Sequence, residues 1–294
     1  MGHSNEDART IMRSAVDRRV LSSRIALLAA LGMLGALAAA GRGPVERDRI
    51  LIFSKTGGFR HQSIPDGIKA LREILSPGYE VDASEDSRVF STENLKRYKC
   101  VVFLSTTGDI LNDSEQKAFE EYIRAGGGYA GVHAAADTEH TWPWYGDLVG
   151  AYFKTHPQIQ LSTVKVEDRM HRSTRMLPAQ WPRTDEWYVY NRNPRDRVRV
   201  LASLDDSTVE GADMGGDHPI AWYHEFQGGR AWYTGGGHTS ESFTEELFRK
   251  HLEGGVLWAA GAAEVAPGAA EVAPGAAEVA PGAGAATPAA PAIK

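Results

Sequence analysis

The chain has 294 residues, of which 42% are hydrophobic and 24% are charged, and its formal net charge is −6 at pH 7. This is the composition of an ordinary globular protein, and the excess of acidic residues argues against nucleic acids and anionic membranes as partners. The single cysteine, Cys100, excludes a disulfide framework and any site built on several cysteine ligands, such as an iron–sulfur cluster.

The first 40 residues are expected to form a cleaved signal peptide. Residues 25–40 are apolar and uncharged, five arginines precede them, and the run ends in three alanines. The run is shorter than the roughly 20 residues of a membrane-spanning helix, and small residues at its end are typical of a cleavage site. We therefore expect export to the periplasm, cell surface or medium, a linker over residues 41–46, and no stable membrane insertion after cleavage. An uncleaved anchor is the alternative; cleavage leaves 27 basic and 35 acidic residues, a net charge of −8.

Residues 47–260 are expected to form one domain that begins with alternating strands and helices. Apolar runs predict strands at residues 49–54, 79–84, 100–105 and 129–132. Helices between them are predicted to start near the capping residues Ser63, Ser91 and Asn112. Because such alternation produces parallel strands with helices on both faces, we predict an α/β fold with a doubly wound, mostly parallel sheet.

The second half of this domain is less regular. Strands are predicted at residues 159–166, 186–190, 198–204, 220–226 and 231–234, followed by a helix at residues 241–259. We expect extra antiparallel strands in this half, and we place His171 and His251 at the surface.

A repetitive tail follows the predicted domain. From Gly261 onward the heptapeptide GAAEVAP occurs three times, and a stretch rich in alanine, proline and glycine continues to Lys294. Because each repeat contains a helix-breaking proline and a single valine, it can form neither a stable helix nor an apolar seam. We expect residues 261–294 to be a disordered, low-complexity spacer.

Functional side chains are expected where the strands end, because ligands of such sheets bind at the carboxyl ends of the strands. His61 follows the first predicted strand, residues 106–109 follow the third, His133 follows the fourth, and His238 follows a later one. We therefore expect these three histidines to meet at one edge of the sheet.

Small residues flank His133 in the segment GVHAA (131–135), a pattern similar to a nucleophile elbow, in which a sharp turn exposes one functional side chain. This segment resembles the ThuA-like (trehalose-utilisation) family, together with FSKTGGFRHQSIPDGI, VVFLSTTGDILND, RTDEWYVYNRNPR, DHPIAWYHEF and GGRAWYTGGGHTSES. The resemblance covers residues 47–260. It implies a flavodoxin-like sheet of the class I glutamine amidotransferase type and a function in carbohydrate utilisation.

The resemblance places His133 at the position that holds the catalytic cysteine in class I glutamine amidotransferases. By the same motifs, Thr107 and Gly108 correspond to the oxyanion loop, and His238 corresponds to the later catalytic histidine. Glutamine hydrolysis through a thioester needs a thiolate at the elbow, and Cys100 lies elsewhere. We therefore expect no glutaminase activity.

Aromatic and acidic side chains in these motifs are suited to sugar binding and acid–base chemistry on a sugar or keto-sugar, as in a hydrolase or isomerase. Rings for stacking on a sugar are supplied by Trp142, Trp144, Tyr145, Trp187 and Tyr188. The predicted catalytic residues are His133, His238, Asp185 and Glu186. The predicted substrate-binding residues are Arg60, His61, Thr107, Gly108, Asp137, Trp144, Tyr145, Trp187, Asp217 and His218.

Alternative interpretations stay open at this point. The aromatic residues can be core side chains, and His218, which precedes a proline, can simply mark a turn. The protein could be a non-catalytic carbohydrate-binding domain, or an amidotransferase-like hydrolase with a different substrate. No cofactor is predicted and no residue is assigned as a metal ligand; three histidines could bind a divalent ion such as zinc, but the sequence lacks a short ligand spacing such as HExxH.

Overall fold

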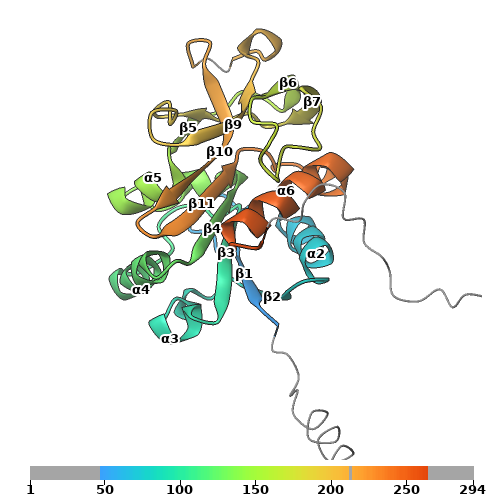
Figure 1. Cartoon of the computed structure of the whole chain (residues 1–294). Coiled ribbons are helices and arrows are strands. Elements are labelled where there is room, and N and C mark those ends of the chain that lie inside the picture. Colours follow the sequence, from blue (N-terminus) through green and yellow to red (C-terminus); the bar gives the residue numbers. More distant parts are fainter. Residues whose placement is uncertain (1–46, 212–213, 264–294) are drawn as a thin grey trace, which may run out of the picture. The chain divides into compact units, whose positions relative to one another are not determined.

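The computed structural model describes residues 47–211 and 214–263 (Figure 1). The predicted signal peptide and linker lie outside the described residues, as do residues 264–294 of the predicted spacer. Among the helices that are described, none is both long and apolar enough to cross a membrane.

The first half of the domain alternates strands and helices, as predicted. In chain order it contains β1 (Arg49–Phe53), α2 (Ile64–Leu75), β2 (Glu80–Ser84), α3 (Thr92–Leu95), β3 (Tyr98–Leu104), α4 (Asp113–Arg124), β4 (Gly128–Val132) and α5 (Pro143–Val149). Short 3₁₀ turns occur at Ser87–Val89 and His133–Asp137. The predicted cap at Asn112 is confirmed, because its side chain and that of Glu115 form a reciprocal capping box at the start of α4.

The second half contains mostly strands. In chain order these elements are β5 (Phe153–Thr155), β6 (Gln160–Val166), β7 (Gln180–Asp185), β8 (Val189–Tyr190), β9 (Arg199–Leu204), β10 (His218–Phe226), β11 (Gly229–Thr234) and α6 (Glu246–Ala259). Further 3₁₀ turns occur at Asp206–Thr208 and Glu241–Thr244.

Nine strands form one sheet in the order β2-β1-β3-β4-β11-β10-β9-β6-β7, and β5 and β8 pair separately. The five strands from β2 to β11 are parallel, and the strands from β10 to β7 continue the sheet in antiparallel pairs. This confirms the predicted α/β fold, with its parallel sheet and extra antiparallel strands. The last strand within the described residues, β11, lies between β4 and β10, in the middle of the sheet.

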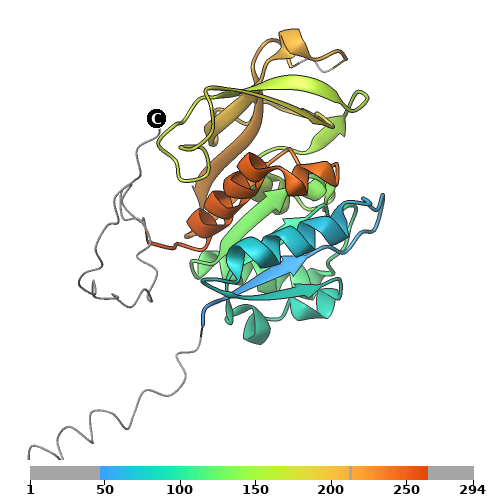
Figure 2. The ribbon, with the colours of Figure 1, turned by 90° about the vertical axis from the view of Figure 1, so that its right-hand side faces the viewer.

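Helices cover both faces of the parallel part of the sheet. Helices α2 and α6 pack against each other on one face, whereas α3, α4 and α5 lie over the other (Figures 1 and 2). Strands β3 and β4 are almost completely buried as a result, which explains their continuous apolar sequences. Phe103 of β3 stacks on Phe119 of α4, with ring centroids 5.4 Å apart.

The structure corrects several sequence-based expectations. His171 and His251 are buried rather than at the surface. The predicted cap Ser63 makes no capping hydrogen bond to α2, because its hydroxyl donates to the carbonyl of Gly237 instead. Residues 186–188 lie outside any strand, between β7 and β8, and the helix predicted from residue 241 begins as a 3₁₀ turn.

Candidate functional site

His133 lies directly after β4, at the sharp turn that the sequence predicted. Its backbone has a φ of 51°, in the left-handed region that costs energy for a residue other than glycine, and its side chain is completely buried. The imidazole Nδ1 donates to the carbonyl oxygen of Gly235 at 2.9 Å, because a carbonyl can only accept. In the neutral ring, Nε2 therefore carries a lone pair toward the neighbouring side chains.

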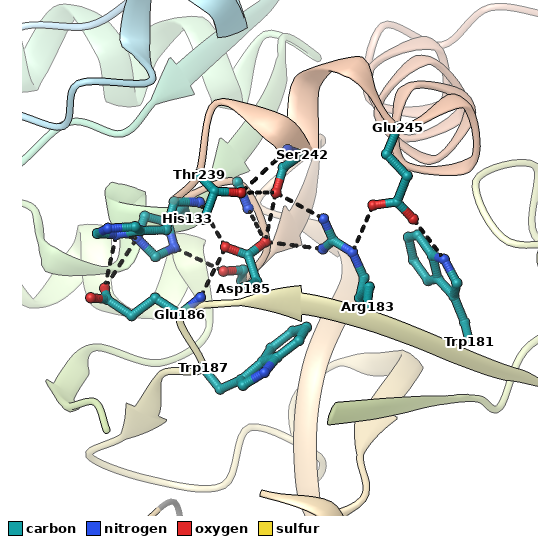
Figure 3. A network of polar contacts seen from close by, with 12 residues as sticks. His133, Trp181, Arg183, Asp185, Glu186, Trp187, Thr239, Ser242 and Glu245 are labelled. Atoms are coloured by element: carbon teal, nitrogen blue, oxygen red, sulfur yellow. Dashed lines mark hydrogen bonds and ion pairs between the residues drawn. The ribbon is translucent and has the colours of Figure 1, made fainter. Parts of the chain in front are cut away.

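Three potential ligand atoms from distant parts of the chain converge here, and one of them is Nε2 of His133 itself. Nε2 of His133 lies 3.2 Å from Nδ1 of His238, which follows β11, and 3.5 Å from Oε2 of Glu186, which follows β7. The same atoms of His238 and Glu186 lie 3.1 Å apart. Figure 3 shows the carboxylate of Glu186 directed toward the imidazole of His133.

His61, from the loop after β1, completes the group. Its ring centroid lies 4.8 Å from that of His133 and 5.0 Å from that of His238, in edge-to-face contact with both. One nitrogen or oxygen from each residue lies within 4.8 Å of the others. We call the group the histidine–glutamate cluster; it consists of His61, His133, Glu186 and His238.

The cluster has an uneven distribution of charge. Burial of Glu186 favours its protonated form, but its interactions with the imidazoles of His133 and His238 outweigh burial and hold the pKa of this carboxyl well below its usual range. Burial also lowers the pKa of His238, but its hydrogen bond to Glu186 outweighs this and leaves the pKa raised. Burial, with repulsion from the other two imidazoles, lowers the pKa of His61 to about 3. At neutral pH, an ionised carboxylate therefore lies against a neutral His61.

Asp185 anchors the backbone around the cluster. Its Oδ1 accepts from the backbone N–H groups of Glu186 and His238, each at 3.0 Å, and its Oδ2 accepts from the N–H of Gly237 at 2.8 Å. The hydroxyl of Ser242 donates to the same oxygen at 3.1 Å, and the Arg183 guanidinium lies at 3.1 Å (Figure 3). This carboxylate is fully buried and has its hydrogen-bonding capacity occupied by structural partners.

A cavity of about 290 Å³ opens beside the cluster. Its lining residues are Phe59, His61, Asp137, Phe153, His156, Glu186, Tyr188 and His238. Nδ1 of His156 lies 3.1 Å from Oε1 of Glu186, on the side of the carboxylate that the cluster leaves free. A larger cavity, of about 480 Å³, borders the opposite ends of the strands near Tyr98 and Arg230, and the described residues that line it include no histidine.

A family model for ThuA, described as trehalose utilisation, matches residues 49–259. The chain belongs to the ThuA family. Among solved structures it is similar to a ThuA-like protein of Bacteroides uniformis, with 26% identity, coverage of 75% of this chain and 94% of the other, and a TM-score of 0.64. A ThuA-like protein of Parabacteroides merdae has 20% identity, with coverage of 73% and 90% and a TM-score of 0.61. A comparison with curated proteins gave no match.

These relatives confirm the predicted class I glutamine amidotransferase-like fold of this ThuA-family protein. A cytoplasmic protein of Salmonella typhimurium LT2 shares the fold alone, with 14% identity, coverage of 72% and 99%, and a TM-score of 0.52.

The structure brings five of the predicted site residues of this ThuA-family protein together. They are His61, His133, Asp137, Glu186 and His238. Two further predicted residues support the wall of the cavity: the hydroxyl of Thr107 donates to the carbonyl of Phe59, and the N–H of Gly108 donates to the carbonyl of Asp137.

The remaining predicted residues lie elsewhere in the fold. Trp144 packs against Phe119 and Phe226, and Arg60 pairs with the exposed Glu85. Asp217 forms an exposed ion pair with Arg195.

The buried members of the predicted set have structural partners. Tyr145 donates from its hydroxyl to the carbonyl of Ala135, and the Trp187 indole donates to the carbonyl of Gln160. The imidazole of His218 forms hydrogen bonds to Asp206 and to the carbonyl of Tyr188. It therefore holds the backbone of Tyr188, which lines the cavity.

Three residues of the cavity were not predicted from the sequence. Phe59, Phe153 and His156 reach it from the loop after β1 and from the β5 region. The only local sequence signal at His156 is the following proline, which favours an extended or turn conformation and does not point to a site. The pairing of β5 with β8, which carries this segment to the cavity, depends on contacts that no local pattern records.

Proposed function

We propose that this ThuA-family protein is an enzyme that acts on a sugar or keto-sugar through acid–base chemistry, by hydrolysis or isomerisation. The observation that carries the proposal is the convergence of the histidine–glutamate cluster on one cavity. Holding an ionised carboxylate against several buried or half-buried imidazoles is a feature of sites where protons move, and a binding domain has no need of it. The family description of trehalose utilisation supports a sugar as the substrate class.

The cavity suits one sugar ring. Its volume of about 290 Å³ lies at the lower end of small-molecule sites, which span roughly 300 to 1,000 Å³. Phe59, Phe153 and Tyr188 supply rings on its wall, and the carboxylates of Asp137 and Glu186 can accept hydrogen bonds from hydroxyls. A disaccharide would place one ring inside and the other toward solvent.

Proton transfer can be divided among groups at different depths. His238, whose imidazole shares a hydrogen bond with Glu186, can polarise a carbonyl or glycosidic oxygen by donation. His156 and Asp137 are more accessible and can accept a proton from the substrate or return one to a leaving oxygen. Asp185 lies behind the cluster and acts as a positioning residue, because it holds the backbone of His238.

Glutaminase chemistry has no nucleophile here. Cys100 is fully buried within β3, where burial raises the pKa of its thiol, so a thiolate is not formed at neutral pH. Export is part of the proposal and is supported by the basic and apolar N-terminal sequence. An exported enzyme would meet its sugar outside the cytoplasm.

Incubation of purified protein with ordinary and oxidised (keto) disaccharides, followed by chromatography of the products, tests the proposal. We expect conversion of at least one substrate class and a loss of turnover in His238→Asn and His156→Ala. His224→Gln is the matched control, since His224 lies on β10 and donates to the carbonyl of Leu148, a bond that glutamine can replace. Sugar binding without any product would favour a carbohydrate-binding domain and refute the proposal that the protein is an enzyme.

A further inference from the structure

We propose that the histidine–glutamate cluster binds one divalent transition-metal ion, for which zinc has the best-fitting ligand chemistry. The cluster supplies three imidazole nitrogens and one carboxylate oxygen. Zinc accepts this combination of ligands, whereas magnesium and calcium prefer sites made of oxygen alone. This inference does not depend on the proposed reaction, because metal binding can be measured without a sugar.

The separations of three cluster atoms match a zinc site. Two ligands of a tetrahedral zinc ion, each at roughly 2.0–2.1 Å from the metal, lie about 3.3 Å apart. The distances among Nε2 of His133, Nδ1 of His238 and Oε2 of Glu186 are 3.2, 3.5 and 3.1 Å. A circle through these atoms has a radius of about 1.9 Å, so an ion at zinc–ligand distance would lie just outside their plane.

The ligand atoms are also oriented by a surrounding shell of hydrogen bonds. The bond from Nδ1 of His133 to the carbonyl of Gly235 leaves its Nε2 free to bind a metal. A backbone carbonyl in this position is a common partner of metal-binding histidines. One oxygen of Asp185 holds the backbone N–H groups of both Glu186 and His238. The side chains thus converge without a metal to pull them together.

His61 provides an independent indication of a ligand. Its side chain is only 4% exposed, and its Nδ1 is buried with no hydrogen-bond partner among the residues that the structure describes. A buried polar atom left without a partner costs about 1–3 kcal/mol, so such atoms usually serve a purpose. Its ring borders both other imidazoles of the cluster, where small movements would bring a nitrogen to the metal.

The cavity gives a bound ion access to a small molecule. His61, Glu186 and His238 all line the cavity, whereas His133 closes the cluster from the protein interior. An oxygen of a small molecule in the cavity could therefore bind the ion as a fifth ligand. In that state His133 and His238 are ligands, and proton transfer is left to His156 and Asp137.

The test is isothermal titration of EDTA-treated, dialysed protein with zinc chloride. We expect one site per chain, and an affinity at least about 100-fold weaker in Glu186→Gln and His238→Asn, since loss of an outer-shell partner alone costs about 10–100-fold. His224→Gln should bind as the native protein does. Cobalt chloride, added in place of zinc, should give visible absorption of a four-coordinate site in the native protein and lose it in both cluster variants.

Circular dichroism and thermal unfolding of each variant show whether it is folded. Glu186→Gln conserves side-chain volume, so it decides the question if His238→Asn fails to fold. A native protein that binds no zinc would overturn the proposal. The proposal would also be overturned if folded Glu186→Gln bound zinc with an affinity within about threefold of that of the native protein, because the ion would then be held elsewhere on the chain.

Discussion

Replacing Asp185 by asparagine removes a negative charge from the fully buried network behind the cluster. The Arg183 side chain, 4% exposed, would then keep Glu245 as its one ionic partner among the residues that the structure describes. One oxygen would also become an NH₂ group, which cannot accept the N–H of Gly237 or the hydroxyl of Ser242. Removing one member of a buried ion pair costs about 3–5 kcal/mol of unfolding free energy. Because Arg183 keeps its ion pair with Glu245, we expect a loss near the lower end of this range, about 3 kcal/mol.

Urea denaturation at neutral pH, followed by tryptophan fluorescence, measures this loss directly. The matched control is Asp217→Asn, because Asp217 pairs with Arg195 at the exposed surface, where an ion pair contributes less than about 1 kcal/mol. A loss in Asp185→Asn no larger than that in the control would refute the assigned role. The same variant should also reduce turnover, since the N–H of His238 loses an anionic acceptor.

Two further predictions concern acid stability and the elbow histidine. Burial lowers the pKa of His251 to about 3, whereas a histidine in the unfolded chain takes up a proton near pH 6.5. The free energy of unfolding should therefore decrease as pH falls from 6.5 toward 3, by roughly 3 kcal/mol at pH 4.5. His251→Asn, which cannot be protonated, should flatten this part of the stability curve in urea titrations at pH 7 and 4.5; an unchanged slope would contradict the reasoning. His133→Ala should abolish sugar conversion and leave the circular dichroism spectrum intact, because it removes one member of the cluster, and normal turnover would exclude His133 from the chemistry.

The parallel half of the fold could be predicted from the sequence because local patterns determine it. Strands buried on both faces, such as β3 and β4, have continuous apolar sequences, and the caps between them mark helix starts. Strand β7 was missed because four of the six residues in its sequence, QWPRTD, are polar and a fifth is a proline. It is recognisable only from its pairing with β6.

The candidate site was predictable in part because it depends on the positions of the parallel strands. Each of the three cluster histidines follows a parallel strand, and parallel strands end at the same edge of a sheet. Asp185 and Glu186 could not be told apart in the sequence, since neighbouring residues differ only in the direction of their side chains. In the structure Glu186 reaches the cavity, whereas Asp185 lies behind it.

The position of β11 has a consequence for when the histidine–glutamate cluster assembles. The strand that leads to His238 comes after all the other strands of this sheet in the sequence, yet it is inserted between β4 and β10. Until its ladder with β4 closes, His133 has neither Gly235 nor His238 beside it. A chain that is still being synthesised or only partly folded therefore lacks the assembled histidine–glutamate cluster, which forms together with the completed sheet.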